Sequence, residues 1–140
     1  MRKPILVAII LILVLGMVPA ATPTGACEPC EPHTPGYWKN HPEVWEGRVN
    51  SYELGILNSP VKGDKYITME KTFIATRLNI LIGNCDDCSS EFYGVVDDVV
   101  TWLTTYQNQR PVAAKSSAWQ EIEWANQLLD DFNNGRIACD

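Results

Sequence analysis

Beyond residue 65, apolar side chains recur every three or four positions in three stretches, which is the period of a helix buried on one face. The first stretch should begin at the capping residue Thr68 and end at Gly83, and the third should begin at the capping-box sequence 117–120 and end at Gly135. The apolar positions of the first are Phe73, Ile74, Leu78, Leu81 and Ile82. Those of the second are Phe92, Val95, Val96, Val99, Trp102, Leu103 and Tyr106. Those of the third are Ala118, Ile122, Ala125, Leu128, Leu129 and Phe132.

Two shorter helices are predicted upstream. Pro42 suits the first position of a short helix, and Glu43 lies in its favourable first turn. Another helix should run from about residue 51 to 58 and end before Pro60. No segment alternates apolar and polar residues as a strand would. We therefore predict an all-α fold, a small irregular bundle of four or five helices supported by disulfides.

The N-terminal quarter of the chain has a different character. Residues 1–20 combine a basic start, an apolar run over 5–15 and a small-residue end, which is typical of a secretory signal peptide. Residues 21–36 hold four prolines and two glycines, a composition that predicts an extended leader. The remaining residues, 37–140, should form a single helical domain.

The fate of the signal segment is open. Cleavage could follow Ala20 or Ala26, where small residues precede the bond. Residues 5–21 are also just long enough to span a bilayer, so an uncleaved membrane anchor is the alternative, and lipidation at Cys27 is a third. Each version places the domain outside the cell, and the membrane enters only through this segment.

The charge of the exported part limits its partners. Without residues 1–20, the 11 basic residues become 9 against 17 acidic ones, a net charge of 9 − 17 = −8. Such a surface repels phosphate backbones, which disfavours nucleic acid, and it suits cationic partners or weakly bound divalent cations.

Five cysteines form two C-x-x-C pairs, Cys27 with Cys30 and Cys85 with Cys88, and leave Cys139 over. Export favours disulfides, because the surroundings are oxidising and a small domain has a thin core. We expect Cys27 or Cys30 to bridge the leader to the loop at 85–88, and Cys139 to hold the C-terminal tail. A zinc site formed by Cys27, Cys30, Cys85 and Cys88 is the alternative, since thiolates at this spacing can share one metal. No other cofactor is indicated.

The candidate binding residues lie in an aromatic block that follows the leader. They are Tyr37, Trp38, Asn40, His41 and Trp45, with His33 nearby. Aromatic rings beside hydrogen-bonding groups can stack on sugars or anchor a protein partner. The competing interpretation is that these rings are core residues, as tryptophans in a small bundle usually are.

No catalytic constellation appears in the sequence. The acidic pairs at 86–87, 97–98 and 130–131 are neighbours in sequence, and neighbours on a helix diverge by about 100°. They are better explained as solvated faces than as paired acids and bases. Motifs for a serine nucleophile, a zinc protease or a phosphate loop are also missing, so we predict no enzyme.

Residues 34–45 have the sequence TPGYWKNHPEVW, and further blocks follow at 57–64, 75–80 and 131–135. The chain thereby resembles a family of exported bacterial and archaeal surface domains marked by TPGYWKNHPE-x-W. The resemblance implies an extracellular location and a domain type, and it carries over no catalytic residue.

Together these features predict a non-enzymatic extracellular or cell-surface module with a binding or structural role. Its partner would be a protein or a glycan. Two sharper alternatives are a carbohydrate-binding module that uses exposed aromatic rings and a zinc-binding domain.

Overall fold

The computed structural model describes residues 30–45, 47–48 and 50–139. Within these residues the chain is helical and contains no strand, which confirms the all-α prediction. The helices are α1 Pro35–Asn40, α2 Pro42–Trp45, α3 Ser51–Asn58, α4 Lys65–Ile82, α5 Ser90–Tyr106, α6 Ser117–Gln120 and α7 Glu123–Asn133. The predicted signal segment and Cys27 lie outside the described residues. Among the described helices, none is long and apolar enough to cross a membrane.

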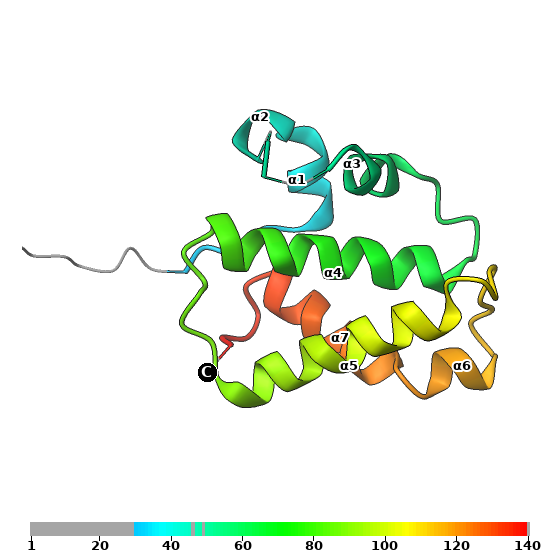
Figure 1. Cartoon of the computed structure of the whole chain (residues 1–140). Helices are drawn as coiled ribbons and strands as arrows, with labels where there is room; N and C mark the ends of the chain where they lie inside the picture. Colours follow the sequence, from blue (N-terminus) through cyan, green and yellow to red (C-terminus); the bar gives the residue numbers. More distant parts are fainter. Residues whose placement is uncertain (1–29, 46, 49, 140) are drawn as a thin grey trace, which may run out of the picture.

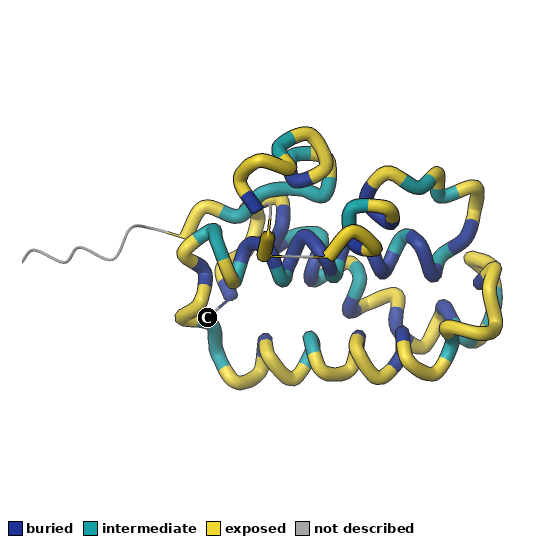
Figure 2. The backbone as a smooth tube through the Cα atoms, turned by 45° about the horizontal axis from the view of Figure 1, so that its top comes forward, coloured by how far each residue is buried: buried dark blue, intermediate teal, exposed yellow. Residues whose placement is uncertain are grey.

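Helix α4 lies at the centre of the fold, with α1 to α3 on one side and α5 to α7 on the other (Figure 1). Each side has its own hydrophobic cluster. One packs Trp38, Trp45 and Leu57 against Ile74 and Leu78 of α4. The other, larger cluster joins α4 to α5, α6 and α7. Figure 2 shows the result, since most of α4 is buried while the outward face of α5 is exposed.

The central position explains why the pattern of α4 was only partly predicted. A single apolar face was expected, but α4 is covered on both sides and also buries the polar residues Thr72, Thr76 and Asn79. Leu81, assigned to the apolar face, is instead exposed, while its neighbours Ile80 and Ile82 pack against the two cores. Period analysis finds one buried face and cannot recognise a helix that is buried all round.

The start of α4 corrects the prediction at Thr68. Asp64 is the capping residue, and its carboxylate accepts hydrogen bonds from the backbone N–H groups of Tyr66 at 3.0 Å and Val112 at 2.9 Å. Arg110 pairs with the second oxygen of Asp64. Thr68 lies inside the helix, where its hydroxyl donates to the carbonyl of Asp64. Asp64 is the better cap because its carboxylate forms charge-assisted hydrogen bonds to two segments, which a threonine hydroxyl cannot do.

Two further boundaries differ from the prediction. The leader ends at Thr34, not at residue 36, because Thr34 caps α1 through the N–H of Tyr37 and Pro35 takes the first helical position. This short helix accounts for one element more than expected. The last predicted helix is divided into α6 and α7 by the non-helical backbone of Ile122, and Ser116 caps α6.

Two disulfides connect the chain ends to the bundle. Cys30 pairs with Cys85, so the leader is bridged to the loop at 85–88, as predicted. Cys139, which was expected to hold the tail, pairs with Cys88 of the same loop. The closed loops span 55 and 51 residues, and each bridge of that length should stabilise the fold by about 4 kcal/mol if unstrained. Such bonds are typical of proteins in an oxidising compartment outside the cytosol.

Gly83, the predicted stop of α4, is required by close packing. A Cβ atom there would lie 2.8 Å from the carbonyl oxygen of Asn79 and 3.3 Å from that of Glu31. Gly83→Ala should therefore lower the free energy of unfolding by about 1–3 kcal/mol, measured by urea denaturation. Gly94→Ala is the matched control in α5, where a Cβ atom meets nothing within 4 Å, and it should raise stability by about 0.5–1 kcal/mol. Equal effects of the two changes would contradict the packing argument.

Candidate functional site

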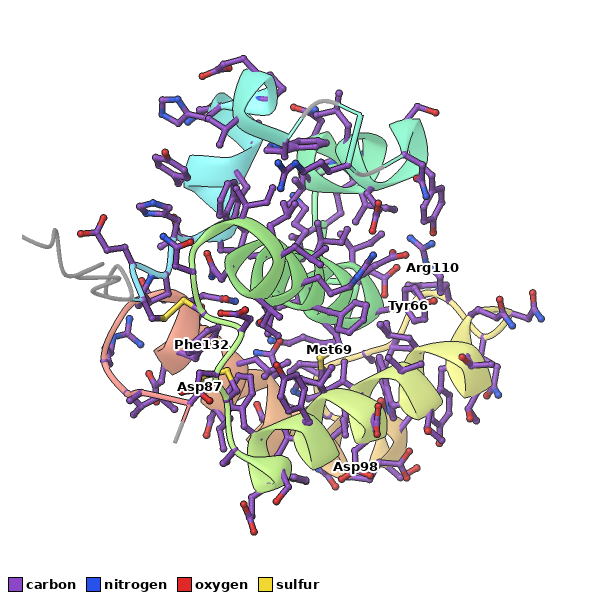
Figure 3. The ribbon with its side chains drawn as sticks, turned by 60° about the vertical axis from the view of Figure 1, so that its left-hand side comes forward. Tyr66, Met69, Asp87, Asp98, Arg110 and Phe132 are labelled. Atoms are coloured by element: carbon purple, nitrogen blue, oxygen red, sulfur yellow. A yellow bond between two sulfur atoms is a disulfide. The ribbon has the colours of Figure 1, made fainter. Side chains whose placement is uncertain are left out.

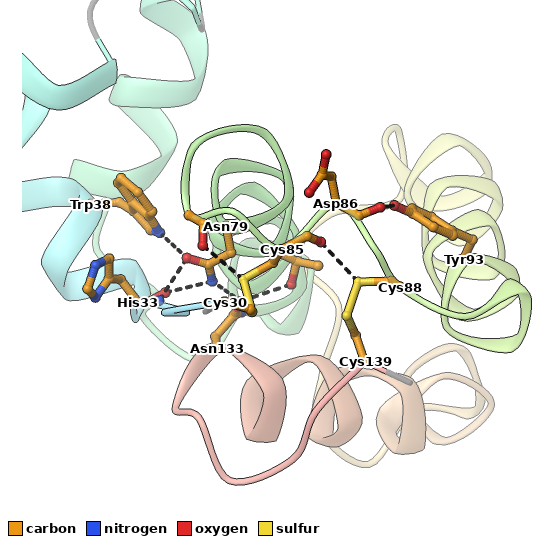
Figure 4. The surroundings of a disulfide bond; sticks show 12 residues. Cys30, His33, Trp38, Asn79, Cys85, Asp86, Cys88, Tyr93, Asn133 and Cys139 are labelled. Carbon is orange, nitrogen blue, oxygen red and sulfur yellow. Dashed lines mark hydrogen bonds between the residues drawn. A yellow bond between two sulfur atoms is a disulfide. The ribbon is translucent and has the colours of Figure 1, made fainter. Parts of the chain in front are cut away.

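The side chain of Asn79 links the leader, α1 and α7 to the central helix (Figure 4). Its Oδ1 accepts hydrogen bonds from the backbone N–H of His33 at 2.7 Å and from the indole N–H of Trp38 at 3.0 Å. Its Nδ2 donates to the carbonyl of His33 at 2.9 Å and to Oδ1 of Asn133 at 2.8 Å. Asn79 is fully buried and uses all of its hydrogen-bonding capacity.

The network continues from Asn133 into α4. The amide nitrogen of Asn133 donates to the carbonyl of Thr72 at 3.0 Å, and its oxygen also accepts from the hydroxyl of Thr76 at 3.2 Å. A buried network in which each of these amide atoms is bonded is rigid, and such networks fix one arrangement of neighbouring helices. Its role is positional, because its polar groups already have partners.

The structure places the predicted aromatic block partly in the core. Trp38 and Trp45 are 1% and 3% exposed, and the indole N–H of Trp45 donates to the carbonyl of Trp38 at 2.9 Å. Their rings are therefore not available for stacking on a ligand, and the core-packing interpretation holds for both. Tyr37, Asn40 and His41 remain at the surface.

Tyr37 is held between two histidines at that surface. The ring centroids of His33 and Tyr37 are 3.8 Å apart, and those of Tyr37 and His41 are 4.4 Å apart. The ring of His33 stacks on Tyr37, whereas the ring of His41 is tilted by 31° against it. Nδ1 of His41 lies 3.1 Å from Oε1 of Glu43. A binding role for Tyr37, Asn40 and His41 stays a prediction.

A buried carboxylate lies at the other end of α4. Burial raises the pKa of Glu70, whose Oε1 accepts a hydrogen bond from the hydroxyl of Tyr52 at 2.7 Å. That bond raises the pKa of Tyr52 to about 12. Arg110 stands over the ring of Tyr66 at 4.8 Å, and Figure 3 shows the two side chains together. Desolvation likewise raises the pKa of Tyr66.

A surface groove of about 260 Å³ separates α5 from the α6–α7 junction. Its lining residues are Asp98, Thr101, Trp102, Thr105, Tyr106, Glu121, Ile122 and Trp124. Trp102 and Ile122 are buried and form the floor, whereas the other lining residues reach the surface. The groove therefore combines an apolar floor with aromatic, hydroxyl and carboxylate groups at its edge.

Trp124 differs from the other tryptophans. Trp38, Trp45, Trp102 and Trp119 are each at most 4% exposed, whereas Trp124 is 49% exposed. Its indole N–H donates to the carbonyl of Glu121 at 3.1 Å, which fixes the ring at the edge of the groove.

The break between α6 and α7 creates this arrangement. In a continuous helix the carbonyl of Glu121 would accept the N–H of Ala125. Here Ala125 donates instead to the carbonyl of Ile122 at 3.0 Å, which leaves the Glu121 carbonyl for Trp124. The carboxylate of Glu121 interacts with the hydroxyl of Tyr106 and raises the pKa of that tyrosine.

None of the residues that line this groove was predicted to bind a ligand. One signal was available, since Trp124 falls between Ile122 and Ala125 and therefore off the apolar face of the last helix. The contribution of α5 was not visible in the sequence, because Asp98, Thr101 and Thr105 look like ordinary solvated positions.

The acidic pairs and the cysteines are the remaining candidates. Asp86, Asp87, Asp97 and Asp98 are exposed, as predicted for solvated faces, while Asp130 and Asp131 both pair with Arg136. Among the described residues, no group of three or more potential metal ligands comes together. Three of the four cysteines of the zinc alternative are in disulfides here, so zinc binding stays a prediction that concerns the reduced protein.

Comparison with known proteins adds no assignment. No family model, curated protein or solved structure matches the chain.

Asn79→Ala should lower the free energy of unfolding by about 3 kcal/mol or more, because it removes the acceptor of the buried indole N–H of Trp38 and one donor to the side-chain oxygen of Asn133. Asn58→Ala is the control, since Asn58 is exposed and its amide donates only to the carbonyl of Leu54. We expect a change below about 0.5 kcal/mol there. Thermal and urea unfolding would measure both, and similar losses would contradict a central role of Asn79.

Glu70→Gln should lower the pKa of Tyr52 from about 12 towards its ordinary value, because the charged acceptor is replaced by a neutral one. Carbon-13 NMR of the tyrosine rings would follow the titration, with the exposed Glu91→Gln as control. The fold holds the Tyr52 proton more tightly than the unfolded chain does. The wild type should therefore lose stability as the pH rises from about 10 to about 12, and Glu70→Gln should lose less. An unchanged Tyr52 titration in Glu70→Gln would contradict this assignment.

Proposed function

We propose that this chain is an exported, non-enzymatic binding module of the cell surface or the extracellular space. Its two disulfides suit an oxidising compartment, and residues 1–20 have the features of a secretory signal or an anchor. The resemblance of residues 34–45 to exported surface domains agrees with this location.

The observation that carries the binding role is the exposure of Trp124. A half-exposed tryptophan leaves a large apolar ring in water, in a domain that buries its other four tryptophans. Because this ring is fixed by a hydrogen bond, it loses little conformational entropy when a ligand stacks on it. Tryptophan is also the residue most enriched where binding energy is concentrated. We therefore place the ligand in the groove between α5 and the α6–α7 junction.

The chemistry of the groove favours a sugar. A flat indole face can stack on the C–H face of a sugar ring, while Thr101, Asp98 and Glu121 can bond to its hydroxyl groups. The volume, about 260 Å³, lies below the usual range for drug-sized ligands, which suits one ring of a longer glycan. The carbohydrate-binding alternative is thus retained, with Trp124 and Tyr106 in place of Trp38 and Trp45.

A non-enzymatic role is proposed from the same residues. The two carboxylates of the groove have different surroundings, since Glu121 interacts with the hydroxyl of Tyr106 whereas Asp98 lies at the exposed surface of α5 (Figure 3). Such a pair is suited to binding hydroxyl or cationic groups.

The proposal is tested by titrating the secreted protein with a panel of cell-wall and surface oligosaccharides and recording tryptophan fluorescence. A ligand should change the emission of the exposed Trp124. Trp124→Ala should weaken binding by about 30-fold, because loss of a tryptophan at the centre of a site costs about 2 kcal/mol or more.

The matched control is Tyr93→Ala, which removes a partly exposed aromatic ring from α5 outside the groove. It should leave the affinity unchanged. A panel without any ligand, or equal losses in Trp124→Ala and Tyr93→Ala, would contradict the proposed site.

A further inference from the structure

We infer that the groove binds an amino sugar whose amino group is free and positively charged. This inference rests on the proposed function, since it names the ligand class for the same groove. Its decisive feature is the charge of the lining. Two carboxylates, Asp98 and Glu121, face the groove, and none of its eight described lining residues is basic.

The two carboxylates come from different elements. Asp98 lies on α5 and Glu121 at the end of α6, so a ligand between them meets negative charge from both walls. Within the described residues, no hydrogen bond or ion pair engages the carboxylate of Asp98. Glu121 interacts with the hydroxyl of Tyr106, and a carboxylate has acceptor capacity for several partners.

The aromatic ring adds to the preference for a cation. The face of an indole attracts ammonium groups as well as C–H groups, because its π-system is negative on the face. Trp124 stands beside Glu121, to whose carbonyl its N–H is bonded. An amino sugar would therefore offer its ammonium group to a carboxylate and its C–H face to the indole, while a plain alkylammonium would leave the groove wall unused.

The hydroxyl groups of the groove and the net charge of the chain also favour an amino sugar. Thr101 and Thr105 line the α5 wall, and the hydroxyl of Thr105 donates to the carbonyl of Thr101, which leaves its oxygen as an acceptor for a sugar hydroxyl. Without residues 1–20 the chain carries 9 − 17 = −8 charges, which attracts a polycation and repels uronic acids.

The experiment compares three oligosaccharides of equal length by isothermal titration calorimetry. They consist of glucosamine, N-acetylglucosamine and galacturonic acid, at a mildly acidic pH that protonates the free amines. The glucosamine oligomer should bind at least about tenfold more tightly than the N-acetylated one, and its affinity should fall as salt is added. The galacturonate oligomer should not bind.

Two variants test the residues. Asp98→Asn and Glu121→Gln should each weaken glucosamine binding by about fivefold to tenfold, because each removes one charge and keeps the shape. The control is Asp97→Asn, which changes the neighbouring exposed carboxylate outside the groove and should have little effect. An equal loss in Asp97→Asn and Asp98→Asn would overturn the inference, since attraction would then be general.

The outcomes also separate this inference from the proposed function. Equal affinity for the glucosamine and N-acetylglucosamine oligomers overturns the amino-group inference and leaves a glycan-binding groove. Absence of binding to all three overturns the inference here, and the wider glycan panel then decides the proposed function. An oligolysine of equal charge serves as the comparison. If it binds with the same affinity as the glucosamine oligomer and loses as much affinity in Asp98→Asn, the ligand is a protein cation and the choice of a sugar is overturned.

Discussion

The fold depends on one buried amide, that of Asn79. Its two polar atoms hold the backbone of His33 from both sides, the ring of Trp38 and the side chain of Asn133, so a single residue fixes the leader, α1 and α7 against α4. Apolar contacts alone would allow these elements to slide, because hydrophobic packing has little direction. Four directional bonds select one arrangement, and any shift would leave buried polar groups without partners.

This constraint gives a physical meaning to the block at 34–45. Thr34 and Pro35 begin α1, Trp38 reaches Asn79, and Trp45 bonds back to the carbonyl of Trp38. The most distinctive residues of the sequence therefore build a corner between two short helices and attach it to the central one. A motif with two tryptophans suggests ligand recognition, but in this chain both tryptophans have a structural role. The part of the block that stays at the surface is Tyr37 with the two histidine rings beside it.

Periodicity predicted the helical class, the end of α4 and the buried face of α5. The placement of the cysteines predicted that disulfides hold the leader and the tail. These features are local, or follow from the compartment in which disulfides form. What failed depends on tertiary contacts. Asp64 replaces Thr68 as the cap because it also binds Val112 far along the chain, and the division at Ile122 lies within an unbroken apolar pattern. The groove was missed for the same reason, since α5 and Glu121 meet only in three dimensions.

The candidate site and the Asn79 network share no residue, and this separation bears on how the ligand preference could change in evolution. The Asn79 network, the two disulfides and the α1–α2 corner fix the frame without using any residue that lines the groove. The groove itself needs only the break at Ile122, which frees the Glu121 carbonyl to hold Trp124, and three side chains on the exposed face of α5. Changes at Asp98, Thr101 or Thr105 would therefore alter what is bound while the frame keeps its stability, which is the arrangement expected of a binding module built on a rigid scaffold.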